Sequence, residues 1–546
     1  MSVRNGIALL LALSTLLFLA ACGSNGSSPA TPVAPPSGNF SNSNLNGTYV
    51  FSVSGTDANG DPYTIAGTFT ANGSGGNGKG GITGGTIDIN DPNVLSPPAI
   101  DASINSNSTY SVGIDGRGQA VIGVTISGIS NFPNLTFDFV LSSSSHGLIT
   151  EFDTYGSASG TLDLQASGVT PSGSYAYSFS GATSSGAAFA SVGNFTLGSG
   201  GAITAGLGDF NNGALTISAG QTLGGTVAVS SPPSTVLSTS QYPTLDFDVF
   251  PIDATHLKFI EVDTNGTLSG DAFSQTSTSI PVGTMAFTLA GITSGNAPVA
   301  AGGFMVTDNA GDITNASTED YNVNGTLSPT TPVSFTGSYA AGGTGRYTLN
   351  NFISFIPAGL TFAAYPSSGG LLFLEIDNLG ITTGAAYPQT AGATLAVSQG
   401  YGMNLAGDNL SNSVEVDDIA QFTTAAGGTL SSGIIDENFA PSAGSGPTLG
   451  IALSSGTYGA LDSQGRYGIS ATAANSKTGT LLGFFDVIAY TVDGTTFPFM
   501  EYDAGQVATG VVVLQSPSSS SPALAHPQIV KVQQLVHPHV AHQKKN

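Results

Sequence analysis

The chain alternates apolar and polar residues over short stretches, and glycine, asparagine, serine or proline separates each stretch from the next. Side chains of a strand point to opposite faces every two residues, so this pattern predicts strands. In the first repeated segment the expected strands are 47–54, 63–71, 81–90, 108–114, 119–127, 135–142, 147–153 and 159–165. Outside the apolar N-terminal segment, no window shows sustained helical periodicity. The sequence therefore predicts an all-β protein.

One block of residues occurs four times without gaps, in the form E-x-D-x5-[ST]-G-x4-Q. Each copy follows an opening stretch of alternating apolar residues and a D-x-N step, always in the same order. Such regular recurrence indicates tandem modules. The block begins at Glu151, Glu261, Glu375 and Glu501. The predicted modules are 46–165, 172–275, 282–389 and 398–515.

Eight short strands in each module can close into a small up-and-down barrel, which leaves no exposed strand edge. A two-sheet β-sandwich has a similar number of strands and is the alternative. We therefore expect four tandem eight-stranded antiparallel modules, with a barrel preferred. A chain of 546 residues is long enough for several hydrophobic cores of this size.

The N-terminus has the features of an exported protein. Arg4 precedes an apolar run from Gly6 to Ala20, and the run ends in Leu19-Ala20-Ala21-Cys22. This segment resembles the lipobox of bacterial lipoproteins, which implies that residues 1–22 are a signal peptide and that Cys22 carries the lipid anchor. Position 23 is Gly instead of Asp, which by the enterobacterial pattern favours the outer membrane, on its periplasmic or surface side. Residues 23–45, rich in Ser, Pro and Gly, are expected to be a flexible tether.

Composition narrows the choice of partners. Without the signal peptide the chain has nine Lys and Arg against 34 Asp and Glu, a net charge of −25. Such a chain repels phosphate backbones, so we expect no nucleic-acid partner. Cys22 is the one cysteine, and it leaves no intrachain disulfide. Residues 516–546 form a basic tail in which His526, His537, His539 and His542 could bind a transition metal weakly, although a solvated tail is the simpler interpretation.

The E-x-D pair is the first candidate site. A spacing of two residues places both carboxylates on one face of a strand, where they could serve as acid and base of a glycan hydrolase. Against this, all four modules carry the pair, and an enzyme seldom repeats a complete active site four times. A structural role is the main interpretation, with cation or ligand binding and catalysis as alternatives.

Three arginines are the candidate ion-pair partners of these glutamates. Each follows a glycine in the same part of its module, and the second module has Gly224-Gly225 there. Arginine offers several fixed donors to a carboxylate. We therefore expect ion pairs within modules 1, 3 and 4, namely Arg117–Glu151, Arg346–Glu375 and Arg466–Glu501.

The D-x-N steps are weak candidates for calcium, because Asp and Asn supply oxygen ligands. Their commoner use is to cap turns through backbone amides. The four steps are Asp88/Asn90, Asp209/Asn211, Asp320/Asn322 and Asp436/Asn438. We expect no other cofactor.

The function predicted from these features is binding, adhesion or envelope scaffolding by tandem modules on a membrane anchor, in preference to enzymatic activity. A glycan or an envelope protein is the candidate ligand. The alternatives are an exported glycan hydrolase using the Glu/Asp pair of one module, and a surface stalk stiffened by calcium. A Ser-His-Asp triad is a poor interpretation, because His146 and His256 belong to different modules. The repeat resembles uncharacterised envelope lipoproteins, and this resemblance adds nothing beyond the location.

Overall fold

A computed structural model gives the fold of the chain. It describes residues 38–517 except 76–77, 96, 213–216, 229–233, 240–243, 356–358, 440–446, 454 and 475–480. Cys22, the predicted signal peptide, most of the predicted tether and the histidines of the tail lie outside the described residues. The described residues all belong to one compact unit. Among the residues described, no helix has the length and apolar character needed to cross a membrane.

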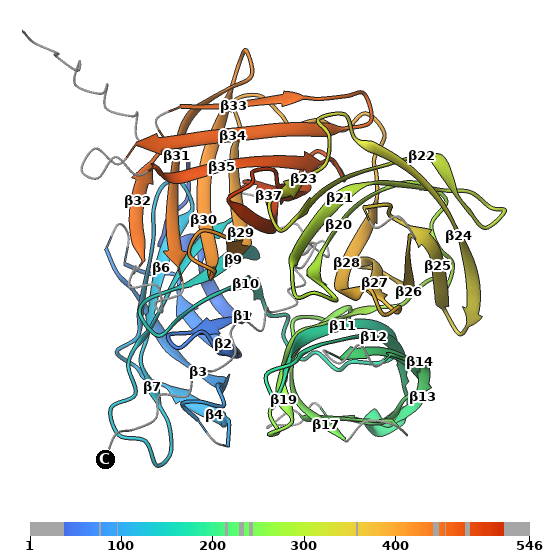
Figure 1. The fold of residues 1–546 in the computed structure, drawn as a ribbon. Helices are drawn as coiled ribbons and strands as arrows, with labels where there is room; N and C mark the ends of the chain where they lie inside the picture. Colours follow the sequence, from blue (N-terminus) through green and yellow to red (C-terminus); the bar gives the residue numbers. More distant parts are fainter. Residues whose placement is uncertain are drawn as a thin grey trace, which may run out of the picture. The chain divides into compact units, whose positions relative to one another are not determined.

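The fold is almost entirely β, with four antiparallel eight-stranded barrels in tandem, which confirms the predicted fold class and the preference for barrels (Figure 1). In barrels 1, 3 and 4 the strands form a complete ring of hydrogen-bonded neighbours, closed by the pairs β2–β3, β21–β22 and β30–β31. In barrel 2 a single bridge between Ala202 and Thr226 closes the ring. Figure 1 shows barrel 2 nearly along its axis.

Barrel 1 follows a short 3-10 helix, Asn42–Asn44. Its strands are β1 (Asn46–Asp57), β2 (Pro62–Asn72), β3 (Gly80–Asn90), β4 (Ala99–Ile104), β5 (Thr109–Val112), β6 (Arg117–Ile122), β7 (Val124–Thr125), β8 (Leu135–Leu141), β9 (His146–Phe152) and β10 (Gly156–Leu164). The eight strands predicted for this module all overlap strands of the barrel wall, while β4 lies where no strand was expected.

Barrel 2 also contains one 3-10 turn, Ser199–Gly201. Its strands are β11 (Gly173–Thr183), β12 (Ala188–Leu197), β13 (Ile203–Asn212), β14 (Ile217–Thr222), β15 (Gly224–Ala228), β16 (Ser234–Ser238), β17 (Leu245–Pro251), β18 (His256–Glu261) and β19 (Gly266–Ser274).

Barrels 3 and 4 repeat the same order. Barrel 3 comprises β20 (Gly283–Thr293), β21 (Pro298–Thr307), β22 (Asp312–Val323), β23 (Thr326–Leu327), β24 (Val333–Gly343), β25 (Arg346–Phe352), β26 (Leu360–Ser367), β27 (Gly370–Glu375) and β28 (Gly380–Pro388). Barrel 4 comprises β29 (Gly400–Asn409), β30 (Val414–Ala425), β31 (Thr429–Phe439), β32 (Thr448–Ala452), β33 (Ser455–Ala460), β34 (Arg466–Ala474), β35 (Leu481–Tyr490), β36 (Thr496–Glu501) and β37 (Gln506–Leu514).

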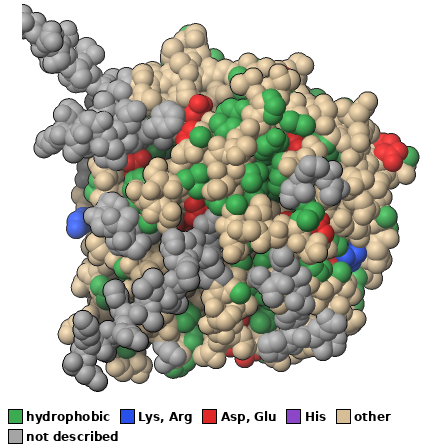
Figure 2. Space-filling view, in the orientation of Figure 1, with side chains coloured by type: hydrophobic (Ala, Val, Ile, Leu, Met, Phe, Trp, Pro, Cys, Tyr) green, Lys and Arg blue, Asp and Glu red, His purple; other side chains and the backbone are tan. Residues whose placement is uncertain are grey.

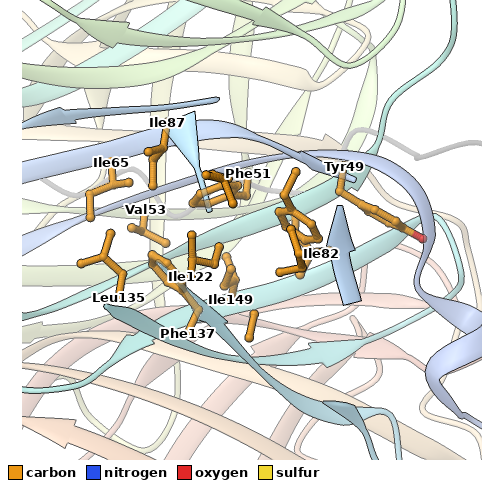
Figure 3. Packing of buried hydrophobic residues seen from close by; sticks show 14 of the residues in the cluster. Tyr49, Phe51, Val53, Ile65, Ile82, Ile87, Ile122, Leu135, Phe137 and Ile149 are labelled. Carbon is orange, nitrogen blue, oxygen red and sulfur yellow. The ribbon is translucent and has the colours of Figure 1, made fainter. Parts of the chain in front are cut away.

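Each barrel has its own apolar interior. In barrel 1 the alternating residues Tyr49, Phe51 and Val53 of β1 point inward, where they meet residues such as Phe137 of β8 (Figure 3). The opening aromatic residue pairs across the ladder with a phenylalanine of the next strand in three barrels, Tyr49–Phe69, Tyr175–Phe195 and Tyr401–Phe422. In barrel 3 the register is offset by one residue, and Phe304 packs instead on Tyr490 of barrel 4.

The glycine of the E-x-D block allows the last strand of a barrel to cross its first strand closely. A Cβ at Gly160 would lie 1.8 Å from the Ser52 carbonyl oxygen. Gly270, Gly384 and Gly510 meet a first-strand carbonyl in the same way. The invariant glycine therefore follows from close backbone approach, since any side chain would separate the two strands.

The outer faces of the barrels are also apolar where barrels meet. Val50 of barrel 1 packs with Ile260 of barrel 2, and Val140 of barrel 1 packs with Val511 of barrel 4. Similar clusters join barrel 2 to barrel 3 and barrel 3 to barrel 4. Each barrel therefore packs on the next along the chain and the fourth packs on the first, which closes the series into a ring. We call these contacts junctions 1–2, 2–3, 3–4 and 4–1.

Candidate functional site

The aspartate of each D-x-N step faces the next barrel of the ring. At junction 2–3, Asp209 of β13 accepts hydrogen bonds from Arg346 of β25, with Nη2–Oδ1 and Nε–Oδ2 distances of 2.6 and 2.8 Å. At junction 3–4, Asp320 of β22 accepts from Arg466 of β34 at 2.5 and 2.7 Å. These are bidentate pairs with almost no exposure to solvent.

A tyrosine of the next barrel adds a third hydrogen bond to each of these two aspartates. The Tyr365 hydroxyl donates to Asp209 Oδ2 at 2.5 Å, and the Tyr490 hydroxyl donates to Asp320 Oδ2 at 2.8 Å. Bonding to Arg346 and Tyr365 gives Asp209 partners for both of its oxygens, as a buried carboxylate requires.

Junction 4–1 closes the ring with the same residue types. Arg117 Nη1 of barrel 1 lies 2.9 Å from Asp436 Oδ2 of barrel 4, although 319 residues separate them in the sequence. Arg117 also bonds Asp115 in its own barrel. The first and last modules are thus joined by the same kind of pair as modules 2 and 3 and modules 3 and 4.

The predicted pairing of each arginine with the glutamate of its own module is therefore wrong. The partners are aspartates instead: Asp115 and Asp436 for Arg117, Asp209 for Arg346, and Asp320 for Arg466. Every module carries both a glutamate and an aspartate, so spacing along the chain cannot distinguish a partner in the same barrel from one in the neighbouring barrel. The three glutamates Glu151, Glu375 and Glu501 are buried elsewhere in their barrels.

The asparagine of each D-x-N step bonds the next barrel through its amide nitrogen. Asn211 Nδ2 donates to the carbonyl oxygens of Glu375 and Gly380, each at 2.9 Å. These two carbonyls flank the turn that contains the E-x-D aspartate. The equivalent donors at the other three junctions are Asn90, Asn322 and Asn438.

The final glutamine of the repeated block also bonds across a junction. Gln275 Nε2 donates to the Pro366 carbonyl at 2.9 Å. Gln515 closes the ring by donating to the carbonyls of Asp115 and Leu141 in barrel 1. Gln165 and Gln389 do the same at junctions 1–2 and 3–4. The landmarks that define the repeat are largely the residues that join one barrel to the next.

The E-x-D carboxylates have structural partners within their barrels. Asp153 accepts hydrogen bonds from the backbone amides of Thr136 and Tyr155, so it caps the turn between β9 and β10. Glu151 is fully buried and accepts from the Tyr63 hydroxyl. Burial raises the pKa of Glu151 well above its usual value, and the nearby Asp153 charge adds to this effect.

The D-x-N residues do not gather into a metal site in the part of the chain that the structure describes. No group of three or more His, Cys, Asp or Glu side chains there is arranged to hold a metal ion. The asparagines act through their amide nitrogens, and the aspartates face another barrel. Calcium at these steps stays a prediction with no ligand set around it.

Junction 1–2 contains a buried network of polar side chains that was not predicted from the sequence. Lys258 Nζ of barrel 2 is fully buried and donates to Thr161 Oγ1 of barrel 1 at 2.7 Å and to Asp271 Oδ1 at 3.2 Å. His256 bonds Asp271, and His146 bonds Asp163, each at 2.6 Å.

A signal for this polar network was present in the sequence. Both histidines of the body lie five residues before the E-x-D glutamate, in modules 1 and 2 alone. Lys258 is the one cationic residue between 166 and 282 and lies in an apolar strand. An isolated lysine in such a strand needs a buried partner, which this junction supplies.

A cavity of about 50 Å³ lies where the four barrels meet. Residues from every barrel line it, among them Thr161, Asp271, Tyr387 and Asn404. Four buried polar atoms in its lining have no protein partner, namely Ser159 Oγ, Ser178 Oγ, Asp271 Oδ2 and Asn404 Oδ1. A space of this size and polarity suits a few ordered water molecules.

The surface drawn in Figure 2 is mostly uncharged, with few basic groups and scattered acidic ones. This agrees with a composition in which only 8% of residues are charged. Polar uncharged side chains and short apolar stretches would therefore make up most of any contact with a partner on this face.

Comparisons with known proteins give little further information. No family model matches the chain, and no curated protein matches it. Solved structures with some similarity include a putative AttH from Nitrosomonas europaea (10% identity, 45% of this chain and 98% of that chain, TM-score 0.17), a mutant of the vaccine antigen Transferrin Binding Protein B from Haemophilus parasuis Hp5 (8%, 73% and 93%, 0.19) and intact Ap-TbpB with its N and C lobes (9%, 93% and 98%, 0.16). At these TM-scores the likeness supports no conclusion, and the function is inferred from the contacts described above.

Proposed function

We propose that the chain is a lipid-anchored binding or scaffold protein of the bacterial envelope, in which a ring of four barrels is presented as one rigid body on a flexible tether. The lipobox resemblance at Cys22 supports the anchor, and the polar segment that follows supports the tether. A glycan or an envelope protein is the ligand class that this composition suits.

The observation that carries the proposal is the use made of the repeated residues. Asparagine and glutamine landmarks bond across every junction, and aspartate–arginine pairs join junctions 2–3, 3–4 and 4–1. Such contacts fix the relative positions of the four barrels, so the loops at their ends keep fixed spacings. Fixed spacing favours a multivalent partner, since several weak contacts then act at a high effective concentration.

The alternative of glycan hydrolysis is less well supported. A general acid has to reach the glycosidic oxygen, within hydrogen-bonding distance. The E-x-D glutamates are instead 0–1% exposed and are enclosed by their own barrels. Asp153 and its equivalents Asp263 and Asp377 are engaged with backbone amides. Four similar buried pairs fit a structural role better than one adapted cleft.

Binding and hydrolysis are separated by one experiment on the purified body from residue 38 onward. We expect saturable binding to isolated envelope fragments and no release of reducing sugar from envelope glycans. Glycan hydrolysis that disappears in Glu151→Gln, Glu261→Gln, Glu375→Gln or Glu501→Gln would contradict the proposal. So would the absence of binding to any envelope fraction.

The anchor is tested in cells by replacing its lipid-attachment residue. The wild-type chain is expected to take up labelled fatty acid and to sediment with membranes, whereas Cys22→Ser should do neither. A wild-type protein without label would remove the anchor from the proposal but would leave the barrel ring intact.

A further inference from the structure

Junction 1–2 differs from the other three junctions in the charge that faces its D-x-N aspartate. Asp88 of β3 meets no arginine and instead hydrogen-bonds the carboxyl group of Asp248 of β17. The two residues are 1% and 4% exposed. Apart from the other carboxyl group, no donor among the described residues reaches Asp88 Oδ2 or Asp248 Oδ2. Two carboxylates can bond one another only when one of them holds a proton.

The charged groups around this pair do not supply the missing cation. Asp101 of β4 donates its backbone amide to Asp88 Oδ1 at 2.6 Å, but its side chain adds negative charge. On β18, Lys258 is held by Asp271 and Thr161, and Glu261 accepts from the Leu268 amide.

The remaining cations of these two modules lie elsewhere. The sequence between 46 and 282 holds only Lys79, Arg117 and Lys258 as lysine or arginine, and the two histidines there, His146 and His256, are bonded to Asp163 and Asp271. Arg117 belongs to junction 4–1, and Lys79 is exposed. The Asp88–Asp248 pair therefore depends on a proton where the other junctions have a guanidinium group.

We propose that a proton shared by Asp88 and Asp248 holds barrel 1 against barrel 2, and that this junction is the pH-sensitive joint of the ring. The idea goes beyond the proposed function and does not depend on it. When the proton leaves, two buried negative charges face one another and the junction loosens. The other contacts of the junction, such as that of Lys258 with Thr161, would then become accessible to solvent.

The direction of the pH effect follows from the protonation of the pair. Burial raises the pKa of Asp88 to about 8, and the Asp248 charge contributes; burial also raises that of Asp248 to about 6. In the unfolded chain both groups lose their protons near pH 4. The folded state binds more protons between these limits, so the stabilisation by the pair is complete at low pH and decreases as the pH rises towards 8.

The test compares wild type with Asp88→Asn and Asp248→Asn across pH 5 to 9, using thermal unfolding and hydrogen–deuterium exchange. Asparagine imitates the protonated acid without titrating. We expect each variant to melt above wild type at pH 9 and close to it at pH 5. In wild type, exchange in 86–104 and 245–251 should increase at pH 9 while the other junctions stay protected. Other buried carboxyl groups also titrate, so the difference between variant and wild type is the quantity that matters.

The matched control is Asp209→Asn at junction 2–3, which has an arginine. It should lower the melting temperature by a similar amount at pH 5 and pH 9. The proposal is overturned if Asp88→Asn and Asp248→Asn behave like this control, or if exchange at junction 1–2 is independent of pH. It is also overturned if calcium ions restore the wild-type junction at pH 9, because a metal ion would then occupy the place assigned to the proton.

Discussion

Buried aspartates set the energetics of the junctions at the scale of single residues. Asp209 and Asp320 are 0% exposed, and each carboxylate is compensated by one guanidinium group and one tyrosine hydroxyl from the next barrel. A buried pair of this kind adds little net stability over an apolar contact, but the loss of one partner leaves a charge without compensation. Specific pairing of neighbours is therefore the main contribution of these residues.

Replacing Arg346 by methionine tests this compensation. Methionine keeps much of the volume and removes the cation, so Asp209 stays buried without its ion pair. We expect a loss of about 3–5 kcal/mol in the free energy of unfolding, measured by urea denaturation. The double variant Arg346→Met/Asp209→Asn should recover part of this loss. A single variant within about 0.5 kcal/mol of wild type would indicate that the pair is not formed.

A second prediction at this scale concerns the buried glutamates. Burial raises the pKa of Glu375 to about 9, with a further contribution from Asp377, while the Thr382 hydroxyl bonds its Oε2. Folding then favours the protonated acid, and its stabilisation is lost as the pH rises from near 4.5 to 9. We expect Glu375→Gln to gain stability relative to wild type as the pH rises through this range. If Glu375→Gln differs from wild type by the same free energy of unfolding at pH 5 and at pH 9, the burial of Glu375 is contradicted.

At the scale of strands, close crossing of the first and last strand shapes each barrel. Gly384 of β28 lies against the Thr288 carbonyl, where a Cβ would come within 2.1 Å of the oxygen. Alanine there has to push two paired strands apart, whereas open positions in other strands tolerate it. The ladder between β20 and β28 is continuous around this point, so the separation would break its hydrogen bonds.

The matched pair Gly384→Ala and Gly459→Ala tests the crossing. A Cβ at Gly459 of β33 meets no atom within 4 Å. We expect Gly384→Ala to lower the free energy of unfolding by about 3 kcal/mol or more and Gly459→Ala to change it by less than about 0.5 kcal/mol. Similar effects of the two substitutions would show that the strands do not approach closely.

The strands themselves were largely predictable from the alternation of apolar residues, because inward-facing positions are set by each barrel's own interior. Residues such as Tyr49 and Phe51 signal this directly. No strand was predicted at β4, the ninth strand of barrel 1, and β14, β23 and β32 hold the same place in the other barrels. Each pairs with the third strand of its barrel but is not part of the closed ring of eight strands. Three of them supply a backbone amide to a D-x-N aspartate: Asp101 of β4 to Asp88, Gly220 of β14 to Asp209, and Gly450 of β32 to Asp436.

At the scale of the whole molecule, the four barrels form a ring in which equivalent strands meet at each junction, and only junction 1–2 lacks the aspartate–arginine pair. The second strand of each barrel packs on the sixth and seventh strands of the next, as β12 does on β26 and β27. The ring explains why residues such as Asn438 and Gln515 repeat so closely: each has the same task at its own junction. A single barrel could not use them.

This ring is what the sequence could not provide. The repeat predicted the number of modules, and the order of landmarks predicted that their roles are equivalent. Assigning Arg117 to Glu151 was wrong because acidic landmarks recur in every module. The partner Asp436 belongs to the last module, and only the three-dimensional arrangement of the barrels brings it next to Arg117. For the same reason the cluster around Lys258, which spans two modules, had no counterpart in the analysis of one module.

A double-mutant cycle between Arg117 and Asp436 tests ring closure most directly. The two side chains meet at 2.9 Å only if the fourth barrel packs on the first. The measured quantity is the coupling free energy obtained from unfolding of wild type, Arg117→Gln, Asp436→Asn and the double variant. The ring predicts a coupling of about 1 kcal/mol or more, since residues in direct contact do not behave additively. Additive effects, with a coupling within about 0.3 kcal/mol of zero, would mean that barrels 1 and 4 are not joined and that the ring is open.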